Sequence, residues 1–416
     1  MELKEVLEAK DRRRGIQEQI LNDYKCPVLV FTMNIAGEVK RNPLVDFAFR
    51  MGVGKILQEL GEPTYKKYLL DATGCEAFFA YRFDAGYIKD ICVKIEELDP
   101  VGRLYDMDVI DIDGQKLSRG EARACIVCGG PVAPCSRSRA HGLDLVKSCT
   151  YSILERFAAK QLAVFAVSSL IEEVRLTPKP GLVDQNNSGA HRDMDLDIFL
   201  KSAHSLYPYF IKAATLGMRQ GGCMKDLQAE GQKAEREMLA VTGGVNTHKG
   251  AIYTLGLLLA AMGSRLVRGG DVFSQVRSLA AAGKAPESET HGGEVRRKFN
   301  SGGARQEAEN GLPHAQRAYR ALKDPRNDEL TVLLQIVSEC PDTNLLYRGG
   351  MNGLKYARRW ARFILLMPKS MRLKLTEFAD RAFNKKNLSP GGCADIFSAS
   401  LFLLKTDFVW NHKDDN

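Results

Sequence analysis

EVRLTPKPGLVDQNNSGAHRDMD, residues 173–195, lies between two apolar helical patterns and matches neither of them. Pro178 and Pro180 are expected to end the preceding helix, because proline lacks a backbone N–H and restricts the residue before it. Gly181 and Gly189 permit sharp turns or a close approach of the backbone to a ligand. Such a bend is typical of a phosphate-and-metal pocket, since its other positions are crowded with polar side chains: Lys179, Asp184, Asn186, Asn187, His191, Asp193 and Asp195.

A second stretch, GGVNTHKGAIYTLGLLLAA at residues 243–261, supports the same interpretation. Asn246, His248 and Lys249 stand where a helix is expected to begin, and helix N-terminal amides beside a lysine bind phosphate well. The following helix is apolar nearly all round, which predicts a central position. His248 has two interpretations: a phosphate ligand, or a core histidine whose hydrogen bonds are satisfied within the protein.

Carboxylates are the candidate metal ligands of this part of the chain. Asp193 and Asp195 precede a predicted helix, where acidic residues also complement the helix dipole. Their closeness to His191 and Asp184 favours metal or ribose binding over that alternative. Further candidates come from GGARQEAENGLPHA (302–315), PDTNLLYRGG (341–350) and NLSPGGCADIFSASLFLL (387–404); they are Arg305, Glu307, Asp342, Asn344 and Asp395.

The first third of the chain mixes helix and strand signals. A helix is predicted over residues 5–24 and a strand over residues 27–35, PVLVFTMNI. Residues 75–95 are expected to form two strands around a turn at residues 84–86. GRLYDMDVIDIDG (102–114) predicts another strand, on which Asp106 and Asp108 share one face because side chains alternate. Two such carboxylates can hold Mg²⁺ against a triphosphate; the alternative is an acidic rim at a strand end.

Three cysteines and one histidine form a possible zinc site. Cys125, Cys128, Cys135 and His141 supply the ligand types that suit tetrahedral Zn²⁺. The alternative is that these cysteines are reduced and packed as small apolar residues. Arg137, Arg139 and His141 are the better candidates for phosphate binding, because guanidinium groups match phosphate oxygens bidentately.

The segments divide between two known families. TPKPGLVD, GAHRDMD and GVNTHKG are long ungapped segments that resemble the triphosphoribosyl-dephospho-CoA synthase family, which makes the precursor of the citrate lyase prosthetic group. TMNIAGEVK, GRLYDMDV and residues 123–141 resemble the citrate lyase holo-synthase family, which loads that group onto a carrier protein. Ala36 stands where the second pattern has a proline, a minor departure at a turn. The two resemblances cover nearly the whole chain.

A chain of 416 residues is expected to hold more than one domain. The resemblance implies an α+β, nucleotidyltransferase-like domain at residues 1–155, followed by an all-α helical-bundle domain at residues 156–416. Strand signals fade after residue 155, which agrees with this division.

The resemblance also implies the chemistry. The C-terminal domain is expected to remove adenine from ATP and join the triphosphoribosyl group to the 2′-hydroxyl of 3′-dephospho-CoA. The N-terminal domain is expected to transfer phosphoribosyl-dephospho-CoA to a serine of the citrate lyase acyl carrier protein (γ subunit), releasing pyrophosphate, with Mg²⁺ as cofactor. Expected catalytic residues are Asp106, Asp108, Asp193 and His191; expected phosphate or substrate contacts are Arg137, Arg139, His141, Lys179, Asn246, His248, Lys249, Arg305 and Glu307; expected metal ligands are Asp106, Asp108, Asp184, Asp193, Asp195, Asp342 and Asp395.

Composition argues against nucleic-acid binding and against a membrane location. The net charge of +8 suits polyanionic small substrates, and the scattered basic residues argue against nucleic acid. No apolar run is long enough to span a membrane, and the N-terminus lacks a signal-peptide core, so we expect no membrane partner and a cytoplasmic location. Two alternatives stay open: a hydrolase that cleaves an ADP-ribose-type N-glycosidic bond, and a zinc-binding adaptor built on the cysteine cluster. A malonate decarboxylase carrier also stays open as the client.

Overall fold

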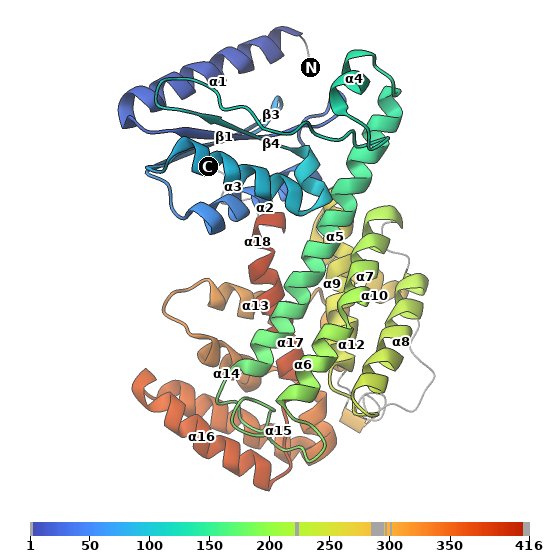
Figure 1. Cartoon of the computed structure of the whole chain (residues 1–416). Helices are drawn as coiled ribbons and strands as arrows, with labels where there is room; N and C mark the ends of the chain where they lie inside the picture. The colour runs from blue at the N-terminus through green and yellow to red at the C-terminus, as the bar shows by residue number, and fades with distance from the viewer. Residues whose placement is uncertain (1–2, 221–223, 284–294, 296–297, 300–301, 411–416) are drawn as a thin grey trace. The chain divides into compact units, whose positions relative to one another are not determined.

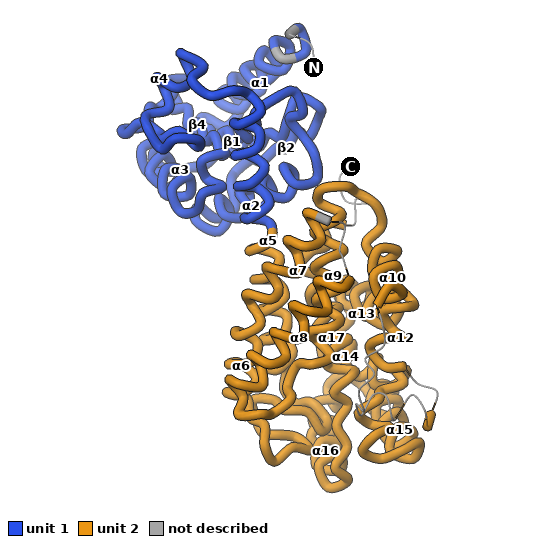
Figure 2. Tube along the Cα trace, turned by 90° about the vertical axis from the view of Figure 1, so that its right-hand side faces the viewer, with its two compact units in different colours: residues 1–158 blue, residues 159–416 orange. Residues whose placement is uncertain are grey.

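The computed structural model describes residues 3–220, 224–283, 295, 298–299 and 302–410. It divides into two compact units, residues 1–158 and 159–416 (Figure 2). The division falls within helix α5 (Leu143–Arg175). The chain is therefore multidomain, and each unit is described separately.

The N-terminal unit contains a four-stranded antiparallel sheet in the order β2-β3-β1-β4. Its strands are β1 (Val28–Met33), β2 (Tyr65–Asp71), β3 (Gly74–Ala80) and β4 (Tyr105–Ile110). In the central strand β1, Val30 pairs with Phe78 on one side and with Asp108 on the other. The strand expected at residues 27–35 is thus confirmed, and it lies inside the sheet.

Helices cover both faces of this sheet (Figure 1). Helix α1 (Leu3–Tyr24) places Ile20 in a core cluster with Val30 and Phe78. On the opposite face lie α2 (Pro43–Leu60) and α3 (Ala85–Leu98). There Phe31 stacks on Phe49 of α2, with ring centroids 5.0 Å apart. Alternation of side chains along β1 therefore divides the unit into two apolar layers.

The expected pair of strands at residues 75–95 is wrong in its second half. Residues after 84 form α3, whose first turn is capped by Asp84: its carboxylate accepts a hydrogen bond from the amide of Tyr87 at 3.0 Å. The buried Ile88, Ile91 and Ile95 recur with a helical spacing. The true hairpin partner of β3 is β2, which precedes it.

Between α3 and α5 the chain forms little regular structure. A 3₁₀ helix, η1 (Pro100–Leu104), leads into β4, and a short helix, α4 (Val132–Arg137), follows it. Glu96 of α3, fully buried at its side chain, forms ion pairs with Arg119 and Arg123. It also accepts the backbone amide of Met107 at 3.0 Å. This buried carboxylate anchors the segment after β4 to the sheet.

The described residues of the C-terminal unit contain helices and no strand (Figure 1). After α5 these helices are α6 (Leu196–Ser205), α7 (Tyr207–Gln220), α8 (Met224–Val241), α9 (Lys249–Arg268), α10 (Val272–Ala282), α12 (Gly303–Glu309), α13 (Pro313–Leu322), α14 (Glu329–Glu339), α15 (Thr343–Leu366), α16 (Lys369–Lys385), α17 (Gly391–Lys405) and α18 (Asp407–Trp410). The Gly- and charge-rich sequence of residues 282–316 predicts a long loop. Much of this segment lies outside the described residues, and the described part includes α12.

Helix α9 is both long and apolar. By length and composition alone it could cross a membrane, but 78% of its apolar window is buried inside the structure. A Cβ on Gly217 of α7 would overlap the carbonyl oxygen of Ala260, and one on Gly263 would overlap that of Ala214. These glycines allow the backbones of α7 and α9 to pack closely. The central position predicted for this helix is confirmed by its burial.

Candidate functional site

The central loop of the C-terminal unit contains a buried ion pair. Lys179, 1% exposed, donates from Nζ to the Glu173 carboxylate at 2.6 Å and to the Glu173 carbonyl oxygen at 2.7 Å. Glu173 lies at the end of α5 and is also buried. Because an ammonium group has three N–H donors, one remains for another acceptor.

Asp184 shapes this loop through backbone hydrogen bonds. Its Oδ1 accepts the amides of Asn186 at 2.7 Å and Asn187 at 3.1 Å, and its Oδ2 accepts the amide of Lys179 at 3.0 Å. Asp380 of α16 holds the same loop, accepting the amide of Gly181 at 2.9 Å. Gly181 has a φ of +70°, and a Cβ there would overlap a backbone carbonyl, so glycine is required.

His191 links the loop to the starts of two helices. Arg348 of α15 donates to its Nδ1 at 3.1 Å, and its Nε2 lies 3.0 Å from the hydroxyl of Ser389, just before α17. Since a guanidinium group only donates, the neutral ring carries its proton on Nε2. Burial, helped by the charge of Arg348, lowers the pKa of His191 to about 4. Asp193 is exposed beside this pair, and its charge opposes the lowering at His191.

His248 stands at the start of α9, buried and 3% exposed. Its Nδ1 lies 2.7 Å from the hydroxyl of Ser202, which lies 2.6 Å from that of Thr247. Burial, with the charge of Lys179, lowers its pKa to about 3, so the ring is neutral. Its Nε2 is buried and has no hydrogen-bond partner within the described residues. Only half of the hydrogen-bonding capacity of this ring is satisfied.

Asp395 brings the start of α17 against the start of α9. Its carboxylate accepts the amide of Ala251, in the first turn of α9. A Cβ on Gly250 would overlap that carboxylate, so this contact depends on glycine. Burial, followed by the charges of Glu173 and Asp342, raises the pKa of Asp395 well above its usual range.

Asp342 joins the start of α15 to that of α17. Its Oδ1 accepts the amides of Asn344 at 2.8 Å and Leu345 at 2.9 Å, and its Oδ2 accepts the amide of Cys393 at 2.7 Å. Burial raises its pKa. The N-termini of α9, α15 and α17 therefore lie together. The N-cap residues of α9 and α17 form no side-chain cap of their own, and Asp395 and Asp342 each accept one first-turn amide instead. The starts of these helices also present the positive ends of their dipoles.

Three further expected residues lie at the edges of this arrangement. Asp195 caps α6, accepting the amide of Ile198 at 2.8 Å. Asn246 accepts the amide of Lys249 at 3.3 Å, and Lys249 pairs with Glu235 of α8 at 2.5 Å. These side chains stabilise the starts of α6 and α9 through hydrogen bonds and an ion pair.

Arg305 and Glu307 of α12 are engaged within the protein. Arg305 pairs with Glu309 at 2.8 Å and donates to the carbonyl of Gly283 at 2.8 Å. Glu307 caps α13: it accepts the amide of His314 at 2.6 Å and lies 2.7 Å from Nδ1 of the same residue. Among the described residues, no hydrogen bond or ion pair joins either residue to the central loop, and Glu307 has a structural role at the start of α13.

The N-terminal unit places its two aspartates on one face of the edge strand β4. Asp106 is exposed, and Asp108 pairs with Lys116 at 2.6 Å. On the same face, Thr32 of β1 pairs with Asp106 on one side and with Glu76 on the other. Acidic groups thus stand on two strands of this face, the one that α1 covers.

Glu76 binds Arg13 of α1 at 2.5 Å, and both side chains keep a buried atom without a partner among the described residues. Arg12 and Asp71 form a neighbouring, more exposed pair at 2.6 Å. Basic groups from α1 therefore pair with acidic groups of β2 and β3.

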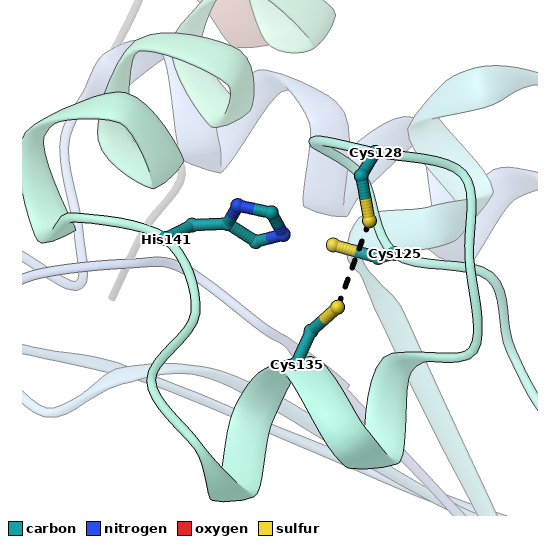
Figure 3. Close-up of side chains that lie close together, drawn as sticks. All are labelled: Cys125, Cys128, Cys135 and His141. Atoms are coloured by element: carbon teal, nitrogen blue, oxygen red, sulfur yellow. Dashed lines mark hydrogen bonds between the residues drawn. The ribbon is translucent and has the colours of Figure 1, made fainter.

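The segment after β4 gathers Cys125, Cys128, Cys135 and His141 (Figure 3). Arg137 and Arg139, the expected phosphate ligands, are exposed nearby on and just after α4. A cavity of about 480 Å³ adjoins this segment, with Arg103, Cys125, Ser152 and Arg156 among its lining residues. Two arginines in its wall make it suitable for an anionic group.

Sequence reasoning missed four residues that build the C-terminal arrangement: Glu173, Ser202, Arg348 and Ser389. Arg348 and Ser389 stood inside segments singled out for other residues, PDTNLLYRGG and NLSPGGCADIFSASLFLL. Glu173 and Ser202 lie within helical patterns, where a polar residue gives no signal of its partner. Their contacts join residues far apart in the chain, and only the fold brings them together.

Comparison with known proteins identifies both units. A family model described as ATP:dephospho-CoA triphosphoribosyl transferase matches residues 159–413, and one described as apo-citrate lyase phosphoribosyl-dephospho-CoA transferase matches residues 1–157. Neither description names a hydrolase or a metal-binding adaptor, so those two alternatives gain no support.

Individual relatives show the same two-part division. Protein CitXG of Haemophilus influenzae is 32% identical over 97% of this chain and 96% of its own length. Protein CitXG of Leuconostoc mesenteroides is 28% identical over 97% of each chain. A probable 2-(5''-triphosphoribosyl)-3'-dephosphocoenzyme-A synthase of Pseudomonas putida is 38% identical. The match covers 59% of this chain and 95% of the length of that relative. The chain therefore belongs to the family of ATP:dephospho-CoA triphosphoribosyl transferases, joined to an N-terminal apo-citrate lyase phosphoribosyl-dephospho-CoA transferase domain.

Proposed function

We propose that the protein makes the citrate lyase prosthetic group and attaches it, in two consecutive transfers. The C-terminal unit joins the triphosphoribosyl group of ATP to 3′-dephospho-CoA and releases adenine. The N-terminal unit transfers phosphoribosyl-dephospho-CoA from that product to a serine of the citrate lyase acyl carrier protein and releases pyrophosphate. The two family descriptions support these steps in this order.

The observation that carries the first step is the meeting of three helix starts around Lys179. Asp342 and Asp395 hold the N-termini of α9, α15 and α17 together. The starts of α9 and α17, with the positive ends of their helix dipoles, are suited to phosphate oxygens, as at other helix N-termini. The third N–H of Lys179 and the unpartnered Nε2 of His248 are further donors or acceptors for the substrate. We assign the triphosphate of ATP to this place.

Breaking the bond between adenine and ribose needs a proton for the base and stabilisation of the developing positive charge. Asp395, whose pKa is raised well above its usual range by burial, is suited to protonate the departing adenine. Asp193, exposed and near the charge of Arg348, is suited to accept the proton of the attacking 2′-hydroxyl. His191 is assigned a positioning role, because its Nδ1 lone pair already accepts from Arg348.

Mg²⁺ fits the acidic face of β4, where Asp106 and Asp108 offer the carboxylate oxygens that this ion prefers. Fewer carboxylates are available to Mg²⁺ in the C-terminal unit, because four of the expected ligands accept backbone amides: Asp184, Asp195, Asp342 and Asp395. Asp193 is therefore the carboxylate proposed to meet the ion there. A bound Mg²⁺ would offset the charge of the polyphosphate.

In the second step, Asp106 and Asp108 would hold the Mg²⁺ that offsets the charge of the leaving pyrophosphate, which is nucleotidyltransferase-like chemistry. Arg137 and Arg139, both exposed, are assigned to phosphates of the incoming intermediate or to the acidic surface of a carrier protein. His141 is assigned to no phosphate, because it lies among three cysteines.

Labelled ATP tests the proposal. The full-length protein is incubated with 3′-dephospho-CoA and ATP that is labelled in adenine or, separately, in the γ-phosphate. We expect the γ-phosphate label in the dephospho-CoA product and the adenine label in free base. Apo carrier protein should then gain the mass of phosphoribosyl-dephospho-CoA while the γ-phosphate label leaves as pyrophosphate. Release of the γ-phosphate label before carrier protein is added would contradict the first transfer.

A further inference from the structure

The four side chains Cys125, Cys128, Cys135 and His141 converge, although they span three different local structures (Figure 3). One ligand atom from each lies within 4.8 Å of every other. The Cys128 and Cys135 sulfurs are 3.6 Å apart, far beyond the ~2.05 Å of a disulfide bond. Two sulfurs at tetrahedral positions around zinc, each with a Zn–S bond of about 2.3 Å, would stand at close to this separation.

The backbone around the first two cysteines is folded as a tight knuckle. The amide of Cys125 donates to the carbonyl of Gly130 at 2.6 Å, and the amide of Gly129 donates to that of Cys125 at 3.0 Å. Gly129 takes a φ of +73°, which a residue with a Cβ rarely adopts. The amide of Val127 points at the Cys125 sulfur, 3.4 Å away. An amide aimed at sulfur is suited to a thiolate, so the knuckle favours metal binding over a packed thiol.

His141 gives an independent observation. Its Nε2 is buried and has no hydrogen-bond partner within the described residues. In Figure 3 its ring is turned toward the three cysteines. A buried ring nitrogen without a partner costs stability unless something binds it, and a metal ion among the sulfurs would satisfy it.

The surrounding segment lacks the apolar core that would otherwise hold it. Between Asp111 and Cys149 the only buried residue is Cys125. Before α5 begins at Leu143, regular structure there is limited to α4, of six residues, and two isolated bridges, Ile110 with Lys116 and Ala124 with Pro131. Segments too small to build a core are commonly fixed by a disulfide or a metal. The 3.6 Å between the Cys128 and Cys135 sulfurs argues against a disulfide.

We propose that Cys125, Cys128, Cys135 and His141 bind one Zn²⁺ ion as a closed, structural site. Three thiolates and one imidazole complete a tetrahedral shell, which leaves no open position for a water or substrate. Binding releases the thiol protons to solvent and keeps His141 neutral, without any redox change. The ion joins the knuckle to α4 and to the start of α5, and so fixes Arg137 and Arg139 between its last two ligands.

Metal content of the purified full-length protein tests the site. We expect one zinc per chain by elemental mass spectrometry, and loss of at least about nine-tenths of it in Cys128→Ser, Cys135→Ser and His141→Ala. His141→Cys should keep the zinc, because a fourth thiolate replaces the imidazole. Cys149→Ser is the matched control: it removes a half-buried cysteine outside the cluster and should keep the zinc.

Cobalt provides a readout that does not depend on variant folding. After zinc is removed by a chelator, Co²⁺ added to the wild-type protein should give thiolate-to-cobalt charge-transfer bands and the intense visible bands of a tetrahedral ion. Protein that contains no zinc and gives no such bands would overturn the proposal, as would a Cys128–Cys135 disulfide in the native protein.

The effect on activity rests on the proposed function and is separable from it. Removal of zinc should slow loading of the carrier protein by at least about tenfold, the usual lower bound for a disturbed metal site, while adenine release continues unchanged. Zinc bound without any carrier loading in the intact protein would contradict the proposed N-terminal transfer and leave the metal site standing. Loading that is unaffected by removal of the metal would overturn the role assigned to the ion.

Discussion

At the scale of single residues, the buried ion pair between Lys179 and Glu173 offers the most direct test. Both side chains are desolvated, at 1% and 5% exposure. Lys179→Met leaves a buried carboxylate without its partner, so we expect the C-terminal unit to lose about 3–5 kcal/mol of unfolding free energy. Trp360 and Trp410, the two tryptophans of the chain, both lie in that unit, so tryptophan fluorescence during urea unfolding reports on it alone.

Lys249→Met is the matched control, because Lys249 also pairs with a glutamate but is 47% exposed. Its loss should cost no more than about 1 kcal/mol. The double variant Lys179→Met with Glu173→Gln should recover part of the stability. If Lys179→Met were no less stable than Lys249→Met, the buried pair would not be the loop's anchor.

The second residue-scale prediction concerns pH. His191 has a pKa of about 4 in the folded protein, whereas an unfolded histidine has one near 6.5. Between these values the unfolded state binds a proton that the native state refuses, so acidification from about pH 6.5 to pH 4 must lower the unfolding free energy. His191→Gln should remove this contribution and flatten the decline of stability with falling pH.

The measurement is tryptophan-detected urea unfolding of both proteins across that window. His204→Gln is the control, since His204 is exposed on α6; its profile should match the wild type. A wild-type slope retained in His191→Gln would mean that this histidine is not held neutral by the fold.

At the scale of elements, the contact between α9 and α17 depends on Gly250. Adding a Cβ there forces the Asp395 carboxylate away from the helix start. Misplacing a catalytic group by about 1 Å costs on the order of a hundredfold in rate, so we expect Gly250→Ala to reduce adenine release by about that factor. Alanine favours helix by about 1 kcal/mol over glycine, so helix propensity would not explain the loss.

Gly231→Ala in α8 is the control, because its Cβ would meet its nearest neighbour, the hydroxyl of Tyr209, at 3.4 Å. Its adenine release should stay within about twofold of wild type, as expected for a substitution that moves no catalytic group. Equal rates of adenine release in Gly250→Ala and Gly231→Ala would show that Asp395 takes no part in the chemical step.

Strand β4 carries the other element-scale prediction. Asp106→Asn changes an exposed side chain, so stability should change by no more than about 0.5 kcal/mol. We expect carrier loading to fall by at least a hundredfold, about 2.7 kcal/mol of transition-state stabilisation, with adenine release unchanged. Asp113→Asn, in the exposed turn after β4, is the control. Loss of adenine release in Asp106→Asn would contradict the assignment of the two steps to separate units.

The elements also show where reading the sequence succeeds. Local sequence patterns located α1, β1 and α9: α1 has apolar residues at a helical spacing, β1 is a short apolar run, and α9 is apolar nearly all round. They failed at α3, since Phe78, Phe79 and the apolar residues after Asp84 can be read as one hairpin until the cap at Asp84 is recognised. At the site, the segments around Lys179 and His248 were found from polar crowding. The roles of Asp342 as a bridge between two helices and of Glu173 as a buried partner depend on contacts across the fold, which no local pattern encodes.

At the scale of the whole molecule, the two units should act as separate catalysts. The Pseudomonas putida relative, named as a probable synthase of the triphosphoribosyl product, matches 59% of this chain with 95% of its own length. Mixing Asp106→Asn with Gly250→Ala should therefore restore loading of the carrier protein, because each chain supplies the step that the other lacks. Loading no faster than that of either variant alone would mean that the intermediate does not pass between chains.

The central claim is that ATP loses its adenine to an attacking hydroxyl of 3′-dephospho-CoA. The most direct measurement is chromatography of free adenine from the wild-type protein with ATP and Mg²⁺, in the presence and absence of 3′-dephospho-CoA. We predict adenine only when the acceptor is present, in a one-to-one ratio with the triphosphoribosyl product. Adenine formed equally well without the acceptor would show a hydrolase and contradict the account.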